Sequence, residues 1–188
     1  MLSLPPIILA SNSPRRQQLM CDAGFTFSVQ SKNVAEDFPA DMPLQDVPVF
    51  LAEKKAAAFV SEIHNEIVVS ADTVVIIGNQ ILNKPVDKEE AKVMLKLLSG
   101  KMHEVITGVC IVSSQKKIVF SDRTEVYFKA LTDNEIEYYI EKYQPFDKAG
   151  AYGAQEWMGM VGVEKIIGSY FNVMGLPIHK VYEVLKTW

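Results

Sequence analysis

Hydrophobic and polar residues follow two periods along the chain, and together these predict strands mixed with helices. Apolar runs or two-residue alternation predict strands at 7–9, 25–30, 67–71, 104–112, 117–129 and 163–167, and a hairpin at 74–82. Capping and stop residues predict helices at 14–24, 46–63, 87–100, 132–145 and 177–186. Asp46 is the expected cap of the second of these helices, and Thr132 with Glu135 is expected to form a capping box for the fourth. This order predicts an α/β fold with a mixed sheet and flanking helices, in which the run from 101 to 129 is antiparallel.

No internal repeat, low-complexity tract or linker interrupts this pattern, so we expect residues 1–188 to form a single domain. The net charge of −4 provides no broad basic field, which argues against a general nucleic-acid or membrane-surface binder. The sequence shows no signal-peptide pattern and no apolar run of about 18 residues. Cys21 and Cys110 are expected to be buried free thiols, and together these features predict a cytoplasmic protein.

The turn after the first strand concentrates groups that bind anions. Ser13 is a good N-cap and Pro14 suits the first helical position, which places Arg15 and Arg16 in the first turn. Positive charges there oppose the helix macrodipole, at a cost of roughly 0.3–1 kcal/mol each. A bound phosphate would satisfy the arginines, the free backbone N–H groups and the hydroxyls of Ser11 and Ser13. The alternative is a solvated basic helix start, and the pair of arginines favours the anion site.

Acidic and basic residues are the remaining candidates for chemistry, because the common nucleotide and metal motifs are absent. The chain has no P-loop, no Gly-x-Gly-x-x-Gly, no His-Glu-x-x-His and no Cys-x-x-Cys sequence. Asp72 is expected at the carboxyl end of a buried strand, where it could hold Mg²⁺ or activate a water. A turn or cap role is the alternative for Asp72. Glu36 could add a metal-binding carboxylate and Lys84 could bind phosphate, although both also fit solvated positions.

Residues 146–155 form a second dense segment of glycine, alanine and polar residues. Its small residues would let the backbone approach a ligand closely. Tyr152 could stack on a ligand, and Gln155 offers both a donor and an acceptor to the edge of a base. A tight loop packed by its own alanines explains the same residues equally well.

Six segments together resemble the Maf-like family of nucleotide pyrophosphatases. They are Ala-Ser-Asn-Ser-Pro-Arg-Arg (10–16), Ala-Asp-Thr-Val-Val (71–75), Asn-Lys-Pro (83–85), and the segments 98–109, 147–155 and 168–177, all in the family's order. The resemblance implies a two-lobed α/β fold similar to that of the inosine triphosphate pyrophosphatases, with an active-site cleft between the lobes. It also implies hydrolysis of a nucleoside triphosphate to the monophosphate and pyrophosphate. Segment 147–155 resembles the subfamily that acts on dTTP and UTP rather than on 7-methyl-GTP.

The resemblance also implies roles for individual residues. Asp72 matches the catalytic acid and, with Glu36, would bind a divalent cation, Mg²⁺ first and Mn²⁺ or Co²⁺ as alternatives. The positions that match substrate-specificity residues are Arg16, Thr73 and Gln155. The positions that match phosphate-binding residues are Ser11, Ser13, Arg15, Lys55, Lys84 and Lys148. Lys55 is chosen over Lys54 because it precedes Ala56 in the family-like Lys-Ala step. The chain departs from the family's usual residues at Asn12, Asn83 and Ala154, which bears on base preference and not on the chemistry.

Two other functions fit the same motifs. A nucleotide-binding regulator of cell division or septum formation would not need significant catalysis, and the retained Asp72 and lysines favour the enzyme. Cleavage of modified nucleotides, a house-cleaning role, would use the same residues. In every case the expected partner is a small-molecule nucleotide, with no nucleic acid or membrane, and the resemblance alone allows a homodimer.

Overall fold

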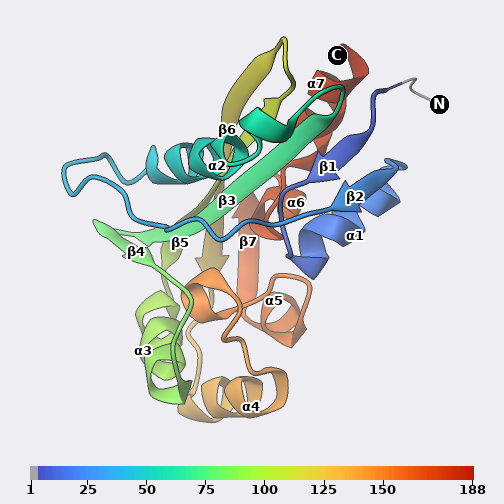
Figure 1. Ribbon diagram of the computed structural model, residues 1–188. Helices are drawn as coiled ribbons and strands as arrows, with labels where there is room; N and C mark the ends of the chain where they lie inside the picture. Colours follow the sequence, from blue (N-terminus) through green and yellow to red (C-terminus); the bar gives the residue numbers. More distant parts are fainter. Residues whose placement is uncertain (1–3) are drawn as a thin grey trace. The chain divides into compact units, whose positions relative to one another are not determined.

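The computed structural model describes residues 4–188, which divide into two compact units (Figure 1). The first unit comprises the chain up to Thr73, Thr107–Asp122 and Gly175–Trp188, and the second comprises Val74–Ile106 and Arg123–Met174. Within the described residues, seven strands form a sheet of order β2-β1-β3-β5-β6-β7, with β4 paired to β3. Both parallel and antiparallel pairs occur, which confirms the predicted α/β fold with a mixed sheet and flanking helices. The cleft between lobes and the single domain over 1–188 stay predictions.

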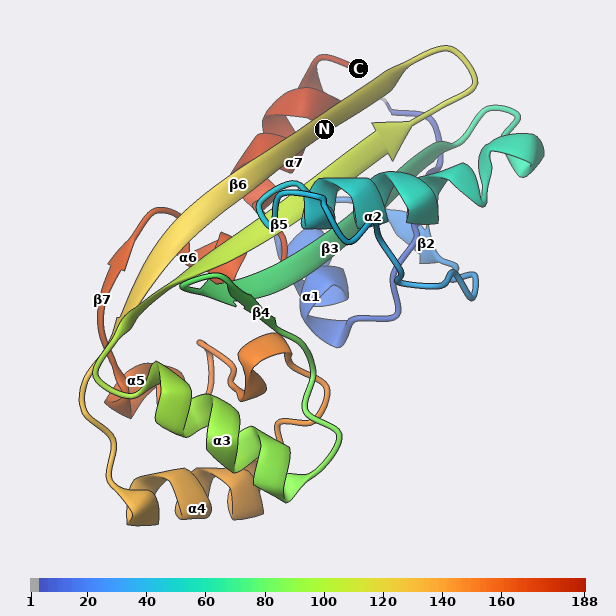
Figure 2. The same ribbon diagram turned by 90° about the vertical axis from the view of Figure 1, so that its left-hand side faces the viewer.

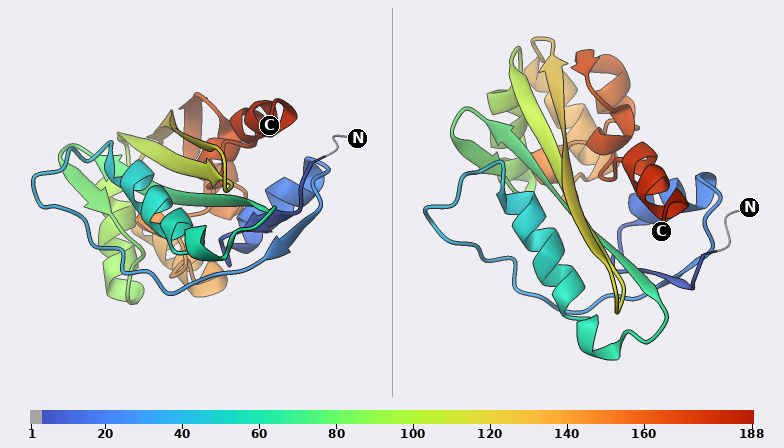
Figure 3. Two further views of the ribbon diagram at one scale, coloured as in Figure 1. Left: turned by 45° about the horizontal axis from the view of Figure 1, so that its top comes forward. Right: turned by 90° about the horizontal axis from the view of Figure 1, so that it is seen from above.

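The first unit begins with a parallel arrangement of three strands. Its elements are β1 (Ile7–Leu9), α1 (Pro14–Asp22), β2 (Phe27–Val29), α2 (Val47–Ala57), the start of β3 (Ile67–Ile77), parts of β5 (Met102–Val112) and β6 (Lys117–Phe128), and α7 (Ile178–Lys186). The chain steps from β1 outward to β2 and then back past β1 to β3. Right-handed crossovers in opposite directions place α1 and α2 on opposite faces of these strands, as Figure 3 shows. The reversal between β1 and β3 creates a switch point, the place where open α/β sheets bind ligands.

Small residues let α2 approach the sheet closely. Ala52 and Ala56, one turn apart on α2, are buried against the strands. The hydroxyl of Ser70 on β3 donates to the carbonyl oxygen of Ala52 at 2.7 Å. A Cβ added to Gly108 on β5 would lie 2.3 Å from the carbonyl carbon and oxygen of Pro48. Glycine at 108 is therefore required by the space between β5 and the start of α2.

The second unit surrounds a separate core. Its elements are the end of β3, β4 (Gln80–Leu82), α3 (Lys88–Leu98), the remaining parts of β5 and β6, α4 (Asp133–Tyr143), α5 (Trp157–Val161), β7 (Val163–Ile167) and α6 (Tyr170–Val173). Helices α3 and α4 lie side by side, as Figure 2 shows. The predicted capping box is present, with Thr132 and Glu135 bonded to each other's backbone at the start of α4. Among the described residues, no helix is long and apolar enough to span a membrane.

A buried histidine and tyrosine lie at the centre of this second core. Nε2 of His103 and the hydroxyl of Tyr152 are 2.7 Å apart, and their rings, with that of Phe128, meet edge to face. His103 is 1% exposed and Tyr152 is 5% exposed. The suggestion that Tyr152 could stack on a ligand is therefore wrong for this structure, because its ring is a core side chain bonded to a buried histidine.

Several sequence predictions need correction. Strand β3 continues to Ile77 because its second half pairs with β4, so Asp72 lies inside β3 and not at its carboxyl end. Helix α2 ends at Ala57 and a short 3-10 turn follows at Val60–Glu62, where the prediction extended the helix to about 63. The side chain of Asp46 makes no capping hydrogen bond. Cys21 is exposed rather than buried, although both cysteines are free as predicted. Helices α5 and α6 were not predicted.

The substitution Gly108→Ala tests the contact between α2 and β5. The added methyl group has no room beside the Pro48 backbone, so we expect a loss of roughly 1–3 kcal/mol in the free energy of unfolding. Gly78→Ala is the comparison, because open space surrounds Gly78 and only its positive φ of +57° opposes a side chain. Urea unfolding monitored by circular dichroism measures both. Equal stability of the two variants would contradict the close approach.

Burial of His103 predicts a pH-dependent stability. Burial lowers the pKa of His103 from 6.5 to about 4. Between these values the unfolded chain binds a proton that the folded chain does not, so stability falls as the pH drops through this window, by about 3 kcal/mol at most. Urea unfolding above pH 6.5 and near pH 4 should show a steeper loss for the wild type than for His103→Gln. Parallel losses in the two proteins would show that His103 does not contribute.

Candidate functional site

The guanidinium of Arg16 occupies the position where β1 stops pairing with β3. Backbone pairing on this edge of β3 reaches Val69, whose carbonyl accepts from the backbone N–H of Ala10 at 2.8 Å. The next carbonyl on the same edge belongs to Ala71, and Nη1 of Arg16 donates to it at 2.8 Å. Arg16 therefore satisfies a strand carbonyl that would otherwise lack a partner from β1.

The same guanidinium holds two further parts of the chain. Its Nε donates to the carbonyl of Gly175 at 2.7 Å, and Nη2 donates to the hydroxyl of Thr73 at 2.9 Å. Nη1 also lies 3.3 Å from the hydroxyl of Ser11. Burial lowers the pKa of Arg16, and the carboxylate of Asp72 opposes that shift. Because a guanidinium has five N–H groups, these four contacts leave Arg16 little capacity to bind a ligand directly.

The hydroxyls predicted to bind phosphate also shape the turn between β1 and α1. Ser13 is the N-cap of α1, and its hydroxyl accepts from the backbone N–H of Arg16. The hydroxyl of Ser11 accepts from the backbone N–H of Ser13 at 3.3 Å. Arg15 lies in the first helical turn as predicted. The structure therefore brings Ser11, Ser13 and Arg16 together at the switch point, with Thr73 beside them.

On the opposite face of β3, an acid–base cluster forms around Lys55. Successive side chains of a strand point to opposite faces, so Asp72 faces α2 whereas Thr73 faces Arg16. Nζ of Lys55 lies 2.5 Å from Oδ1 of Asp72 and 2.7 Å from Oε1 of Glu36. The side chains of Asp72 and Lys55 are 12% and 19% exposed, whereas that of Glu36 is 54% exposed. One buried carboxylate and one half-exposed carboxylate thus share a single ammonium group.

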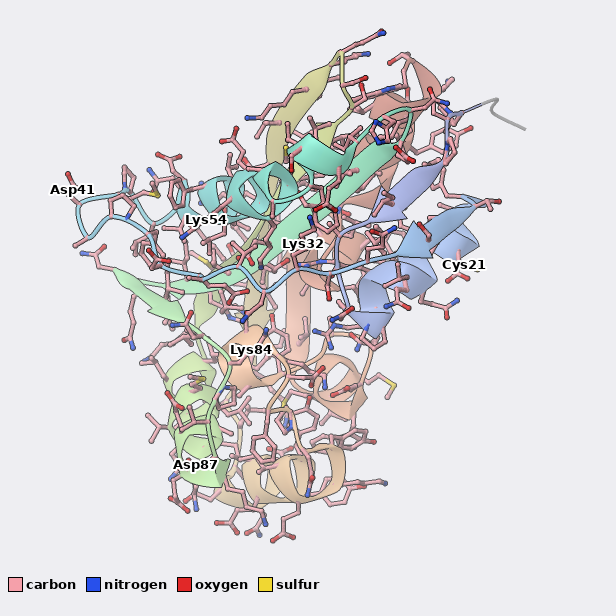
Figure 4. The ribbon with its side chains drawn as sticks, in the orientation of Figure 1. Cys21, Lys32, Asp41, Lys54, Lys84 and Asp87 are labelled. Atoms are coloured by element: carbon pink, nitrogen blue, oxygen red, sulfur yellow. The ribbon has the colours of Figure 1, made fainter. Side chains whose placement is uncertain are left out.

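Helical periodicity explains why Lys55, and not Lys54, reaches this cluster. Lys55 follows Ala52 by three residues and so shares the face of α2 that packs on the sheet. Lys54 is turned toward the neighbouring loop, where its Nζ lies 2.6 Å from Oδ1 of Asp37, and it is labelled in Figure 4. The side chain of Asp37 is 78% exposed. The two lysines therefore form two similar ion pairs, of which only one is buried.

Asp72 and Glu36 also fit a hard divalent cation. Their carboxylate oxygens converge on one position, at which the Lys55 ammonium now supplies the positive charge. Mg²⁺ is commonly held by one or two carboxylates together with substrate phosphates. Among residues 4–188, no group of three or more His, Cys, Asp or Glu side chains could hold a metal ion by itself. The donor set therefore matches a cation that binds together with a phosphorylated ligand.

The second unit carries the other predicted site residues. Lys84 is exposed on the segment between β4 and α3 (Figure 4), and the adjacent carbonyl of Asn83 accepts from the backbone N–H of Gly150 at 3.1 Å. This bond holds the Lys84 segment against the turn at Ala149–Ala151. Gln155 is exposed on the turn that precedes α5.

Lys148 belongs to a buried network that the sequence analysis did not find. It is 7% exposed, and its Nζ lies 2.6 Å from Oδ1 of Asp147 and 3.0 Å from Oε1 of Glu156. The hydroxyl of Tyr139 on α4 donates to Oε2 of Glu156 at 2.5 Å and accepts from the backbone N–H of Gly153 at 3.0 Å. Burial, together with the bond to Glu156, raises the pKa of Tyr139. Glu156 thus holds Lys148 at one end of this segment, and Tyr139 holds Gly153 at the other. No sequence motif indicates the role of Glu156 or of Tyr139.

Comparisons with known proteins identify the family. The Staphylococcus aureus Ham1 protein, a solved structure, aligns with a TM-score of 0.44 at 14% identity, over 65% of this chain and 71% of that chain. Proteins called dTTP/UTP pyrophosphatase from Cytophaga hutchinsonii, Bacteroides fragilis and Flavobacterium johnsoniae are each 50% identical to this chain, over 180, 182 and 182 residues. These alignments cover 96% of this chain and 83%, 94% and 94% of the relatives. A family model described as Maf-like protein matches residues 6–188, so the chain belongs to the Maf-like protein family.

Proposed function

We propose that this protein hydrolyses nucleoside triphosphates, dTTP and UTP in preference, to the monophosphate and pyrophosphate. The observation that carries the proposal is the buried carboxylate of Asp72, fixed against Lys55 and Glu36 beside the switch point. A buried carboxylate inside β3, the ammonium group beside it and the free N–H groups at the start of α1 suit phosphoryl-type chemistry. Such chemistry depends mainly on positioning and electrostatic stabilisation. Relatives that are 50% identical are called dTTP/UTP pyrophosphatase, which supports the same activity here.

In the proposed reaction, Asp72 orients a water and takes its proton as the water oxygen attacks the α-phosphorus. The bond between the α-phosphorus and the bridging oxygen breaks, and pyrophosphate leaves. Lys55, released from its carboxylate partners by the bound phosphates, neutralises charge on the leaving group. A divalent cation, Mg²⁺ first and Mn²⁺ or Co²⁺ as alternatives, would be held by Asp72 and Glu36 and would neutralise phosphate charge as a Lewis acid.

The remaining residues divide between the phosphates and the base. The triphosphate is bound by Arg15, the hydroxyls of Ser11 and Ser13, and the N-terminus of α1. Lys84 and Lys148 are also assigned to the negative charge of the phosphates. Gln155 and Thr73 are each assigned to recognition of the pyrimidine edge. Arg16 acts on specificity by holding Thr73, because most of its N–H groups are already engaged.

The proposal extends to the setting in which the enzyme works. Its ligand is a free nucleotide rather than a nucleic acid, because the net charge of −4 leaves only a local basic site. Modified pyrimidine nucleotides would use the same residues and so belong to the same substrate class. We place the protein in the cytoplasm, where such nucleotides are found, and a homodimer is the assembly that the family resemblance allows.

The substitution Asp72→Asn tests the activity. Loss of the water-activating carboxylate should lower release of pyrophosphate from dTTP and UTP by at least about 100-fold. Asp37→Asn is the matched control, because it removes the exposed carboxylate of the neighbouring lysine pair and should leave the rate unchanged. Pyrophosphate and monophosphate are quantified together for dTTP, UTP, CTP, GTP and 7-methyl-GTP, with and without a chelator of divalent cations. Nucleotide binding without any cleavage by the wild type would favour the regulator instead.

The lysine pair on α2 gives a second test. Lys55→Met should lower kcat/KM for dTTP by about 10- to 1,000-fold, because it removes the positive charge beside Asp72. Lys54→Met removes the same charge one residue away and should retain the wild-type rate. Steady-state kinetics, with circular dichroism to verify folding, measures both variants. Similar rates in the two variants would show that the position of Lys55 is unimportant.

A further inference from the structure

A buried hydroxyl on β5 contacts the hydroxyl that is assigned to base recognition. Oγ1 of Thr107 lies 2.9 Å from Oγ1 of Thr73, and Thr107 is fully buried. Strands β3 and β5 are neighbours in the sheet, and both residues belong to the first unit. Thr107 lies in one of the family-like segments, yet the proposed mechanism gives it no role.

By distance alone either hydroxyl could be the donor of this contact, and the other hydrogen bonds of Thr73 assign its direction. The hydroxyl of Thr73 has one proton and two lone pairs. It accepts from Nη2 of Arg16 at 2.9 Å and lies 3.3 Å from the carbonyl oxygen of Gly175, which can only accept. All three contacts are hydrogen bonds at once only if Thr73 donates to Gly175 and Thr107 donates to Thr73. Both lone pairs of Thr73 are then occupied.

The hydrogen bond that Thr73 donates can be redirected from Gly175 to a ligand. Its contact with the carbonyl of Gly175 is longer than the usual 2.5–3.0 Å of an O–H···O bond. That carbonyl also accepts from Nε of Arg16 at 2.7 Å, so it stays hydrogen-bonded if Thr73 turns away. Gly175 holds this position with a φ of +113°, which favours glycine. Thr73 can therefore donate a hydrogen bond to a ligand but cannot accept one from it.

We infer that Thr107 is a specificity-positioning residue, which makes Thr73 a donor only and so selects a carbonyl over an amino group on the pyrimidine. The inference rests on the proposed function, because it assumes that Thr73 meets the base. Uracil and thymine present an acceptor where cytosine presents an amino donor. An amino group facing Thr73 would meet a hydroxyl with no free lone pair, and a buried donor without an acceptor is unfavourable.

Two substitutions of Thr107, one that removes its hydroxyl and one that keeps it, test the inference. In Thr107→Val the side chain keeps its shape but cannot donate, so Thr73 regains a lone pair that can accept from cytosine. The ratio of kcat/KM for UTP to that for CTP should fall by about tenfold or more relative to the wild type. Thr107→Ser keeps the donor and should retain the wild-type ratio. In the background of Thr73→Val, adding Thr107→Val should change the ratio no further, because Thr107 acts through Thr73.

Ser70→Ala separates this effect from a general loss of packing. Ser70 is also fully buried on β3, but its hydroxyl faces α2 and contacts the carbonyls of Ala52 and Cys110. Its loss should lower stability and leave the UTP-to-CTP ratio unchanged. Folded Thr107→Val with the wild-type ratio would overturn the inference and leave the proposed function intact. Absence of pyrophosphate release by the wild type would overturn the proposed function, and the inference with it.

Discussion

The described site depends on one hydrogen bond, in which the side chain of Arg16 donates to a carbonyl of β3 that has no donor from β1. β1 is only three residues long and β4 pairs with β3 only from Val75 onward, so the stretch of β3 between them has no partner strand on this edge. A buried carbonyl without a donor is costly, and Arg16 supplies the donor from the helix that directly follows β1. The short strand thus leaves room at the switch point, and the arginine keeps that opening compatible with a stable sheet.

Two kinds of chemistry then lie on the two faces of one strand. Asp72 reaches α2, where small residues bring the helix backbone close and Lys55 with it. Thr73 reaches the other face, where Arg16 and the carbonyl of Gly175 hold it. The alternation of a strand therefore places an acid–base cluster and a hydroxyl held by Arg16 next to each other in sequence while keeping their hydrogen bonds separate.

Much of this arrangement could be predicted from the sequence, where the signal is local. Ser13, Pro14 and the capping box at Thr132 act within a few residues, and the structure has them as expected. The family resemblance was confirmed by the comparisons. The position of Asp72 within β3 was wrong, because pairing with β4 extends the strand and no local signal reports a partner strand.

The contacts of Thr107 and Glu156 could not be predicted for the same reason. Each depends on a side chain that is distant in sequence, Thr73 for one and Tyr139 for the other. Lys55 could be preferred to Lys54 only by resemblance, since the face of α2 that packs on the sheet is known only once the sheet is formed. The assigned roles of the site residues stay predictions until the variants are measured.

The bond between Arg16 and Gly175 has a consequence for the order in which the site can form. These residues are 159 positions apart, so the whole second unit lies in the loop that their contact closes. During synthesis from the N-terminus, the Nε of Arg16 has no such acceptor until Gly175 has left the ribosome. Closing so long a loop carries an entropic cost, which is smaller once the intervening residues are already ordered. Completion of the site is therefore a late event, which makes the geometry of the site depend on synthesis of nearly the entire polypeptide.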